Sequence, residues 1–117
     1  MVAVLTDLMF QVKIQDAAKR AGVAAVFVSS HEDALARASE SPSLIILDLN
    51  YPGAAPLELI HKLKAQETTA RIPLLAYVAH VQADLIQAAR QKGCDRILAR
   101  SAFSQNLPAI LGELAAN

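Results

Sequence analysis

The apolar run Leu44–Leu47, followed directly by Asp48, constrains the fold of this chain more than any other feature. Four consecutive apolar residues indicate a strand buried on both faces, which is typical of parallel sheets covered by helices on each side. A carboxylate is expensive to bury without a partner, so Asp48 is expected at the open edge beyond the strand. Because ligands bind at the carboxyl ends of strands in open α/β sheets, Asp48 is the first candidate for a functional residue.

Apolar runs alternate with helical patterns along the whole chain. The expected strands are Val2–Leu5, Val23–Val28, Leu44–Leu47, Ile72–Val78 and Ile97–Ala99. A helical pattern follows each strand, and the last helix is expected to begin near Asn106. Five such units predict an α/β fold with a doubly wound, five-stranded parallel sheet in the order 2-1-3-4-5.

The composition predicts one well-packed domain over residues 1–117 and excludes several classes of function. Apolar residues make up 54% of the chain, and 117 residues suffice for one core but not for two. Eleven basic residues balance eleven acidic ones, which argues against nucleic acid or an anionic membrane as a partner. The single cysteine, Cys94, offers no disulfide and no metal-binding motif, and no segment is long enough to span a membrane. The expected location is therefore the cytoplasm.

The expected strand order brings two carboxylates and one cation to the same edge of the sheet. Asp7 follows the first strand, Asp48 ends the third, and Arg100 follows the fifth. Two carboxylates and the backbone carbonyl of Asn50 would suit Mg²⁺, which prefers a few hard oxygen ligands. A carboxylate beside such a metal can attack a phosphoryl group, whose oxygens the cation would neutralise. Asp48 could instead only cap the following turn, and Asp7 could only begin the first helix.

These features resemble the receiver domains of two-component response regulators, the CheY-like family, over essentially the whole chain. The similarity lies in three segments, LIILDLNYPG, IPLLAYVAH and GCDRILARSAF. It implies a flavodoxin-like (CheY-like) three-layer sandwich in which Asp48 corresponds to the phosphorylated aspartate of the family. It also implies that Asp7 and the backbone carbonyl of Asn50 help to hold Mg²⁺.

Five positions depart from the pattern that this resemblance implies. Thr6 stands where the family has the first of two acidic residues, and Val78 replaces a hydroxyl residue at the end of the fourth strand. Arg100 replaces a lysine, Ser101 replaces the proline that follows this lysine, and Ile97 replaces an aromatic switch residue. Val78 cannot donate a hydrogen bond to a phosphoryl oxygen, and arginine is a planar fork rather than a point charge. The resemblance is therefore to a degenerate receiver.

The leading functional hypothesis is a receiver-like signalling module of a two-component phosphorelay, with no output domain. Arg100 can pair with Asp48 or Asp7 and hold the site closed, or it can bind phosphate; pairing with Asp48 is favoured. Phosphorylation of Asp48 is thus expected to be weak or absent. The module would act by contact with a histidine kinase or another signalling protein, through its first helix or through the face formed by the fourth helix, fifth strand and fifth helix. The sequence leaves the oligomeric state open.

Three alternative functions remain. A fully competent single-domain phosphoacceptor would need Arg100 to take the place of the family's lysine. A flavodoxin-like cofactor-binding protein would need a loop rich in glycine and hydroxyl groups after the first strand, which the residues from Asp7 to Phe10 do not provide. A phosphatase would need a general acid and a substrate pocket, so the chain is not expected to be an enzyme.

Overall fold

The computed structural model describes residues 1–80 and 82–116. Within these residues, five parallel strands form one sheet in the order β2-β1-β3-β4-β5, which confirms the predicted topology. The strands are β1 (Val2–Val4), β2 (Val26–Val28), β3 (Ile45–Asp48), β4 (Leu74–Val78) and β5 (Arg96–Ala99). The chain reverses its winding between β1 and β3, so the carboxyl ends of these two strands form the point at which such sheets bind ligands.

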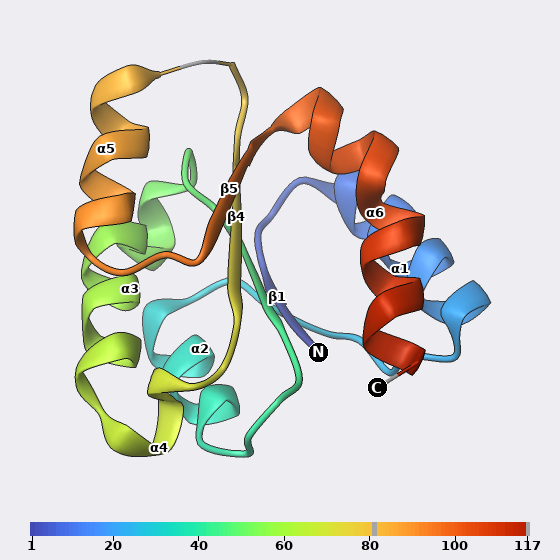
Figure 1. Ribbon diagram of the computed structural model, residues 1–117, viewed down its shortest axis with the longest axis horizontal. Coiled ribbons are helices and arrows are strands. Elements are labelled where there is room, and N and C mark those ends of the chain that lie inside the picture. The colour runs from blue at the N-terminus through green and yellow to red at the C-terminus, as the bar shows by residue number, and fades with distance from the viewer. Residues whose placement is uncertain (81, 117) are drawn as a thin grey trace.

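Helices cover both faces of the sheet (Figure 1). One face carries α1 (Leu8–Ala21) and α6 (Arg100–Ala116), and the other carries α2 (His31–Ala38), α3 (Pro56–Ala65) and α5 (Ala83–Gln91). Two short elements flank α3, namely the 3-10 helix η1 (Pro52–Ala54) and α4 (Glu67–Ala70). The result is the expected three-layer sandwich. None of the helices within the described residues has the length and apolar character of a membrane span.

The last helix begins earlier than the sequence predicted. It starts at Arg100, directly after β5, and not near Asn106, so Pro108 lies inside the helix rather than at its first turn. Three buried side chains spaced four residues apart explain the earlier start: Phe103, Leu107 and Leu111. The prediction was wrong because proline was taken as a start signal, whereas this exposed proline is tolerated within a helix whose other face is firmly packed.

The strands are also shorter than predicted at several ends. β2 begins at Val26 and not at Val23, because the residues before it complete the end of α1. Gly22 adopts a left-handed conformation with φ 73°, and the Val23 N–H then donates to the Ala18 carbonyl at 2.8 Å. β4 likewise begins at Leu74, directly after a proline that cannot donate to a strand ladder.

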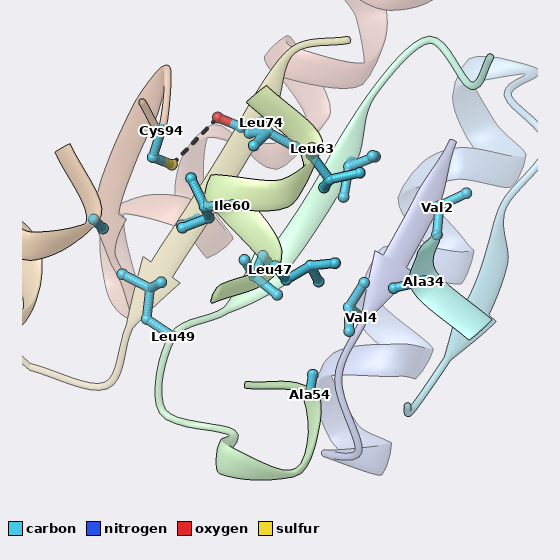
Figure 2. Close-up of a cluster of buried hydrophobic side chains, with 14 of the residues drawn as sticks. Val2, Val4, Ala34, Leu47, Leu49, Ala54, Ile60, Leu63, Leu74 and Cys94 are labelled. Carbon is cyan, nitrogen blue, oxygen red and sulfur yellow. Dashed lines mark hydrogen bonds between the residues drawn. The ribbon is translucent and has the colours of Figure 1, made fainter. Parts of the chain in front are cut away.

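The core consists of two clusters of buried apolar side chains, one on each face of the sheet. Because successive residues of a strand point to opposite faces, Ile46 and Leu47 lie in different clusters. Leu47 packs with Ile60 of α3 (Figure 2). Ile46 lies in the cluster that contains Tyr77 of β4 and Phe103 of α6. The sheet is thereby enclosed between two apolar layers.

The single cysteine, Cys94, belongs to the cluster that contains Leu47 and Ile60. Cys94 is 9% exposed, and its thiol lies 3.6 Å from the carbonyl oxygen of Leu74 (Figure 2). Burial raises the pKa of the Cys94 thiol above its ordinary value. A buried thiol with a raised pKa is a poor nucleophile, which agrees with the packing role that the sequence indicated.

Candidate functional site

Asp7 links the first strand to both helices on one face of the sheet. It is the N-cap of α1, and its Oδ1 accepts a hydrogen bond from the backbone N–H of Phe10 at 3.2 Å. Its Oδ2 accepts a hydrogen bond from the guanidinium group of Arg100, the first residue of α6. The bond from Phe10 and the charge and hydrogen bond of Arg100 lower the pKa of Asp7, against the opposing effect of burial. Asp7 therefore both begins the first helix and takes part in the site.

Arg100 is held by two contacts on the α1 side of the edge. It forms an ion pair with Asp7, and its guanidinium carbon lies 4.2 Å from the centre of the Phe10 ring. A cation over an aromatic face is attracted by the electrons of the ring. The favoured prediction, an ion pair between Arg100 and Asp48, was wrong, because α6 begins at Arg100 and packs along α1, which carries its partners.

Asp48 is the last residue of β3 and is half-buried. Its Oδ1 accepts a hydrogen bond from the backbone N–H of Asn50 at 2.8 Å, which is the turn-capping role considered from the sequence. Burial raises the pKa of Asp48, the Asn50 N–H and the charge of Arg100 oppose this effect, and the charge of Asp7 adds to it. The charge of Asp48 is thus compensated less well than that of Asp7.

The side chain of Asn50 joins two loops at the sheet edge. Its Oδ1 accepts a hydrogen bond from the backbone N–H of Ala79 at 2.7 Å, and its Nδ2 donates to Oε1 of Gln82 at 2.7 Å. The loop after β3 is in this way tied to the loop after β4. From the sequence, only the backbone carbonyl of Asn50 was expected to contribute to the site, and this side-chain bridge was not predicted. No sequence signal reveals it, since both partners lie about thirty residues away.

Two of the positions that depart from the receiver pattern, Val78 and Ile97, are filled by packed apolar side chains. Val78 is fully buried, and Ile97 is half-buried against the same cluster. The neighbouring Tyr77 does carry a hydroxyl group, but its side chain is only 2% exposed, and the hydroxyl finds no hydrogen-bond partner among the described residues. Its ring stacks on Phe103 with 4.8 Å between the ring centres, and it lies 5.1 Å from the ring of Phe10.

The groups that could bind Mg²⁺ are the carboxylates of Asp7 and Asp48 and the backbone carbonyl of Asn50. These are hard oxygen ligands of the right kind, but both carboxylate oxygens of Asp7 already accept hydrogen bonds. Asp48 Oδ2 makes no hydrogen bond with any described residue and remains available. A metal ion that used Asp7 would have to displace Arg100. In the part of the chain that the structure describes, three or more acidic, histidine or cysteine side chains do not gather as a metal site anywhere.

Comparison with solved structures identifies the fold. The structure superposes on a response regulator from Hahella chejuensis with a TM-score of 0.85 and 19% sequence identity, covering 97% of this chain and 92% of the other. The chemotaxis response regulator CheY4 of Vibrio cholerae gives a TM-score of 0.82 and 19% identity, covering 97% and 95% of the two chains. The receiver domain of a sensor histidine kinase from Pseudomonas aeruginosa, which holds a magnesium ion in its active-site cleft, gives 0.82 and 20%, covering 99% and 96%.

The chain therefore has the CheY-like fold of response regulator receiver domains. Structural likeness at about 20% identity establishes the fold, while the activity depends on the residues at the site. No protein-family model matches the sequence. A search among curated proteins finds no significant match.

Proposed function

We propose that this chain is a receiver-type signalling module whose candidate phosphoacceptor, Asp48, is phosphorylated weakly or not at all. The observation that carries this proposal is the ion pair between Arg100 and Asp7. A guanidinium group that is bonded to Asp7 is not free to neutralise phosphoryl oxygens on Asp48. Likewise, a carboxylate that is bonded to Arg100 is not free to bind a metal ion. This one contact therefore opposes both the neutralisation of a phosphoryl group and the binding of a metal ion.

The chemistry of the proposed site is phosphoryl transfer to a carboxylate. Asp48 Oδ2 would attack the phosphorus atom of the donor, a new P–O bond would form, and the bond to the leaving group would break. When bound, Mg²⁺ would neutralise charge on the transferred group, and Asp48, Asp7 and the carbonyl of Asn50 would hold it. The magnesium in the Pseudomonas aeruginosa receiver domain supports this choice of metal.

Two further features of the resting protein oppose the reaction. The backbone N–H of Ala79 points into this edge but already donates to the side chain of Asn50. Val78 is buried and has no donor to offer. Since phosphoryl transfer depends on donors placed around the transferred oxygens, each missing donor makes the phosphorylated state less stable. We propose that the module does not act as an enzyme and works by contact with another protein.

The proposed contact surface lies on α1, beside the site. Leu8 and Met9 are each 74% exposed and Val12 is 68% exposed, so three large apolar side chains face solvent on one helix. Exposed apolar groups gathered in this way mark interaction surfaces. We propose that a histidine kinase or another signalling protein docks here. Replacing these three residues with serine should abolish capture of such a partner while the circular dichroism spectrum stays unchanged.

The direct test is the intact mass of the protein after incubation with Mg²⁺ and acetyl phosphate. We expect little phosphoryl adduct on the wild-type chain and more on the Arg100→Lys variant, because a lysine lacks the planar fork that binds Asp7. The Asp48→Ala variant is the control and should gain none. A stoichiometric adduct on the wild type that is lost in Asp48→Ala would instead establish a fully competent phosphoacceptor.

A further inference from the structure

The hydroxyl group of Tyr77 is the one buried side-chain oxygen or nitrogen atom in residues 1–80 and 82–116 that lacks a hydrogen-bond partner. Tyr77 is only 2% exposed, so bulk water does not supply a hydrogen-bond partner for its hydroxyl group. A buried unpaired hydroxyl costs free energy, and native structures rarely retain one without a reason. The neighbouring rings of Phe10 and Phe103 supply packing but no acceptor. The hydroxyl of Tyr77 is therefore an unused hydrogen-bond donor.

This donor lies beside Asp48 in the sheet. Tyr77 and Asp48 are direct partners in the parallel ladder between β3 and β4. Tyr77 belongs to the core cluster on the α1 and α6 face, together with Ile46, two residues before Asp48. Because strand residues two apart share a face, Asp48 is on the same face as Tyr77. The pKa of Tyr77 is raised first by burial and then by the charge of Asp48, so the field of this carboxylate reaches the hydroxyl.

In the resting site the hydroxyl of Tyr77 donates a hydrogen bond to neither carboxylate. Both carboxylate oxygens of Asp7 are occupied, and the Asp48 carboxylate makes no hydrogen bond to Tyr77. A phosphoryl group on Asp48 would add three strong acceptor oxygens beyond the carboxylate. We propose that, when Asp48 carries a phosphoryl group, the Tyr77 hydroxyl donates a hydrogen bond to it and supplies the donor that Val78 lacks. This inference rests on the proposed role of Asp48.

The packing of Tyr77 also determines which helices such a hydrogen bond would affect. Its ring packs against Phe10 of α1 and Phe103 of α6, and the guanidinium group of Arg100 lies over the Phe10 ring. A shift of the Tyr77 ring toward a phosphoryl group would therefore act on α1 and α6. Ile97 of β5 has no polar group and no ring to follow the anion. Tyr77 thus couples the anion to the face that carries the exposed side chains of α1.

The test uses beryllium fluoride with Mg²⁺, because this anion mimics a phosphoryl group on a carboxylate. The chain contains no tryptophan and two tyrosines, so the Tyr51→Phe protein emits fluorescence from Tyr77 alone. We expect its emission to fall as beryllium fluoride binds, since hydrogen bonding to an anion quenches a phenol. By calorimetric titration, Tyr77→Phe should weaken binding about tenfold or more, as for a lost hydrogen bond to a charged group. Tyr51→Phe removes the other hydroxyl and should leave the affinity unchanged.

The outcomes separate this inference from the proposed function. Equal affinities of the Tyr77→Phe and wild-type proteins would overturn the inference and leave Asp48 as the anion site, provided that Asp48→Asn abolishes binding. Absence of binding even to the Arg100→Lys protein would also overturn it, while the contact role of the module would stand. Rapid stoichiometric phosphorylation of the wild type would contradict the proposed function yet leave the Tyr77 comparison readable. In the unmodified protein, Tyr77→Phe should not lower the melting temperature; a clear loss would show that the hydroxyl already has a partner.

Discussion

The proposed closed state of the site depends on the ion pair between Asp7 and Arg100. The coupling energy of this pair can be measured directly. The perturbation is a double-mutant cycle of Asp7→Asn, Arg100→Met and the combined variant. Asparagine keeps an oxygen that can accept the N–H of Phe10, so the cap of α1 survives while the charge is lost. Methionine keeps an apolar stem over the Phe10 ring. The cycle therefore isolates the charge pair from the cap and from the packing.

The expected coupling energy follows from the exposure of the two side chains. At an effective dielectric constant of about 20, two unit charges 4 Å apart attract by about 4 kcal/mol before desolvation and side-chain entropy are subtracted. Measured exposed pairs keep about 0.2–1 kcal/mol of this. The side chains of Arg100 and Asp7 are 39% and 31% exposed, which is less than for most surface pairs. We therefore expect the upper end of that range, about 1 kcal/mol.

The assay is urea unfolding followed by circular dichroism at pH 7. The internal control is the same cycle on Arg20 and Asp16 of α1, whose side chains are 80% and 59% exposed, and which should couple by about 0.3–0.5 kcal/mol. High salt should reduce the control coupling more than that of the site. A coupling between Asp7 and Arg100 no larger than the control value would show that the pair does not hold the site, and the argument for weak phosphorylation would fail.

Three other perturbations have defined outcomes. Arg100→Met should raise the affinity for Mg²⁺ several-fold, because Asp7 loses its competing partner; calorimetric titration measures this, and an unchanged affinity would argue against Asp7 as a ligand. Asp48→Asn should raise the free energy of unfolding at pH 7, because burial places the pKa of the folded state above its ordinary value of 3.8 and the charged form is penalised. That gain should vanish in urea titrations below pH 3.8, where wild-type Asp48 is protonated in both states. Gly53→Ala should cost about 1–3 kcal/mol, because its new methyl group would overlap the ring of Tyr51, and Tyr51→Leu should remove most of this extra cost in the same unfolding assay.

The fold was predicted from the alternation of apolar runs with helical patterns along the chain. The five apolar runs became five parallel strands in the expected order, because each run can be buried only between two layers of helices. The ends of the elements were predicted less well. β2 lost Val23 to the cap of α1, and α6 begins at Arg100, before its expected start near Asn106. Such boundaries depend on which neighbour buries a side chain, and a local pattern does not contain that information.

The edge at which the site lies was also predictable, since strand ends converge there in any sheet of this order. Which groups bond to one another was not. The sequence placed Arg100 near two acidic residues and favoured Asp48, whereas the packing of α6 against α1 selects Asp7. The amide bridge of Asn50 and the unpaired hydroxyl of Tyr77 depend on the register of β3 with β4. These are properties of tertiary packing and leave no trace in residue spacing.

The substitutions at this edge act in one direction when they are taken together with the geometry. Relative to the receiver pattern that the sequence resembles, Thr6 offers no carboxylate to a metal ion, Val78 offers no hydrogen-bond donor, and Arg100 binds Asp7. Under the proposed function, each change would lower the stability of an anion on Asp48 relative to the empty site and so favour the resting conformation. The buried hydroxyl of Tyr77 is the exception, because its cost falls only on the resting state. A site with both features would be slow to accept a phosphoryl group, and once charged it would respond through α1 and α6 rather than through β5.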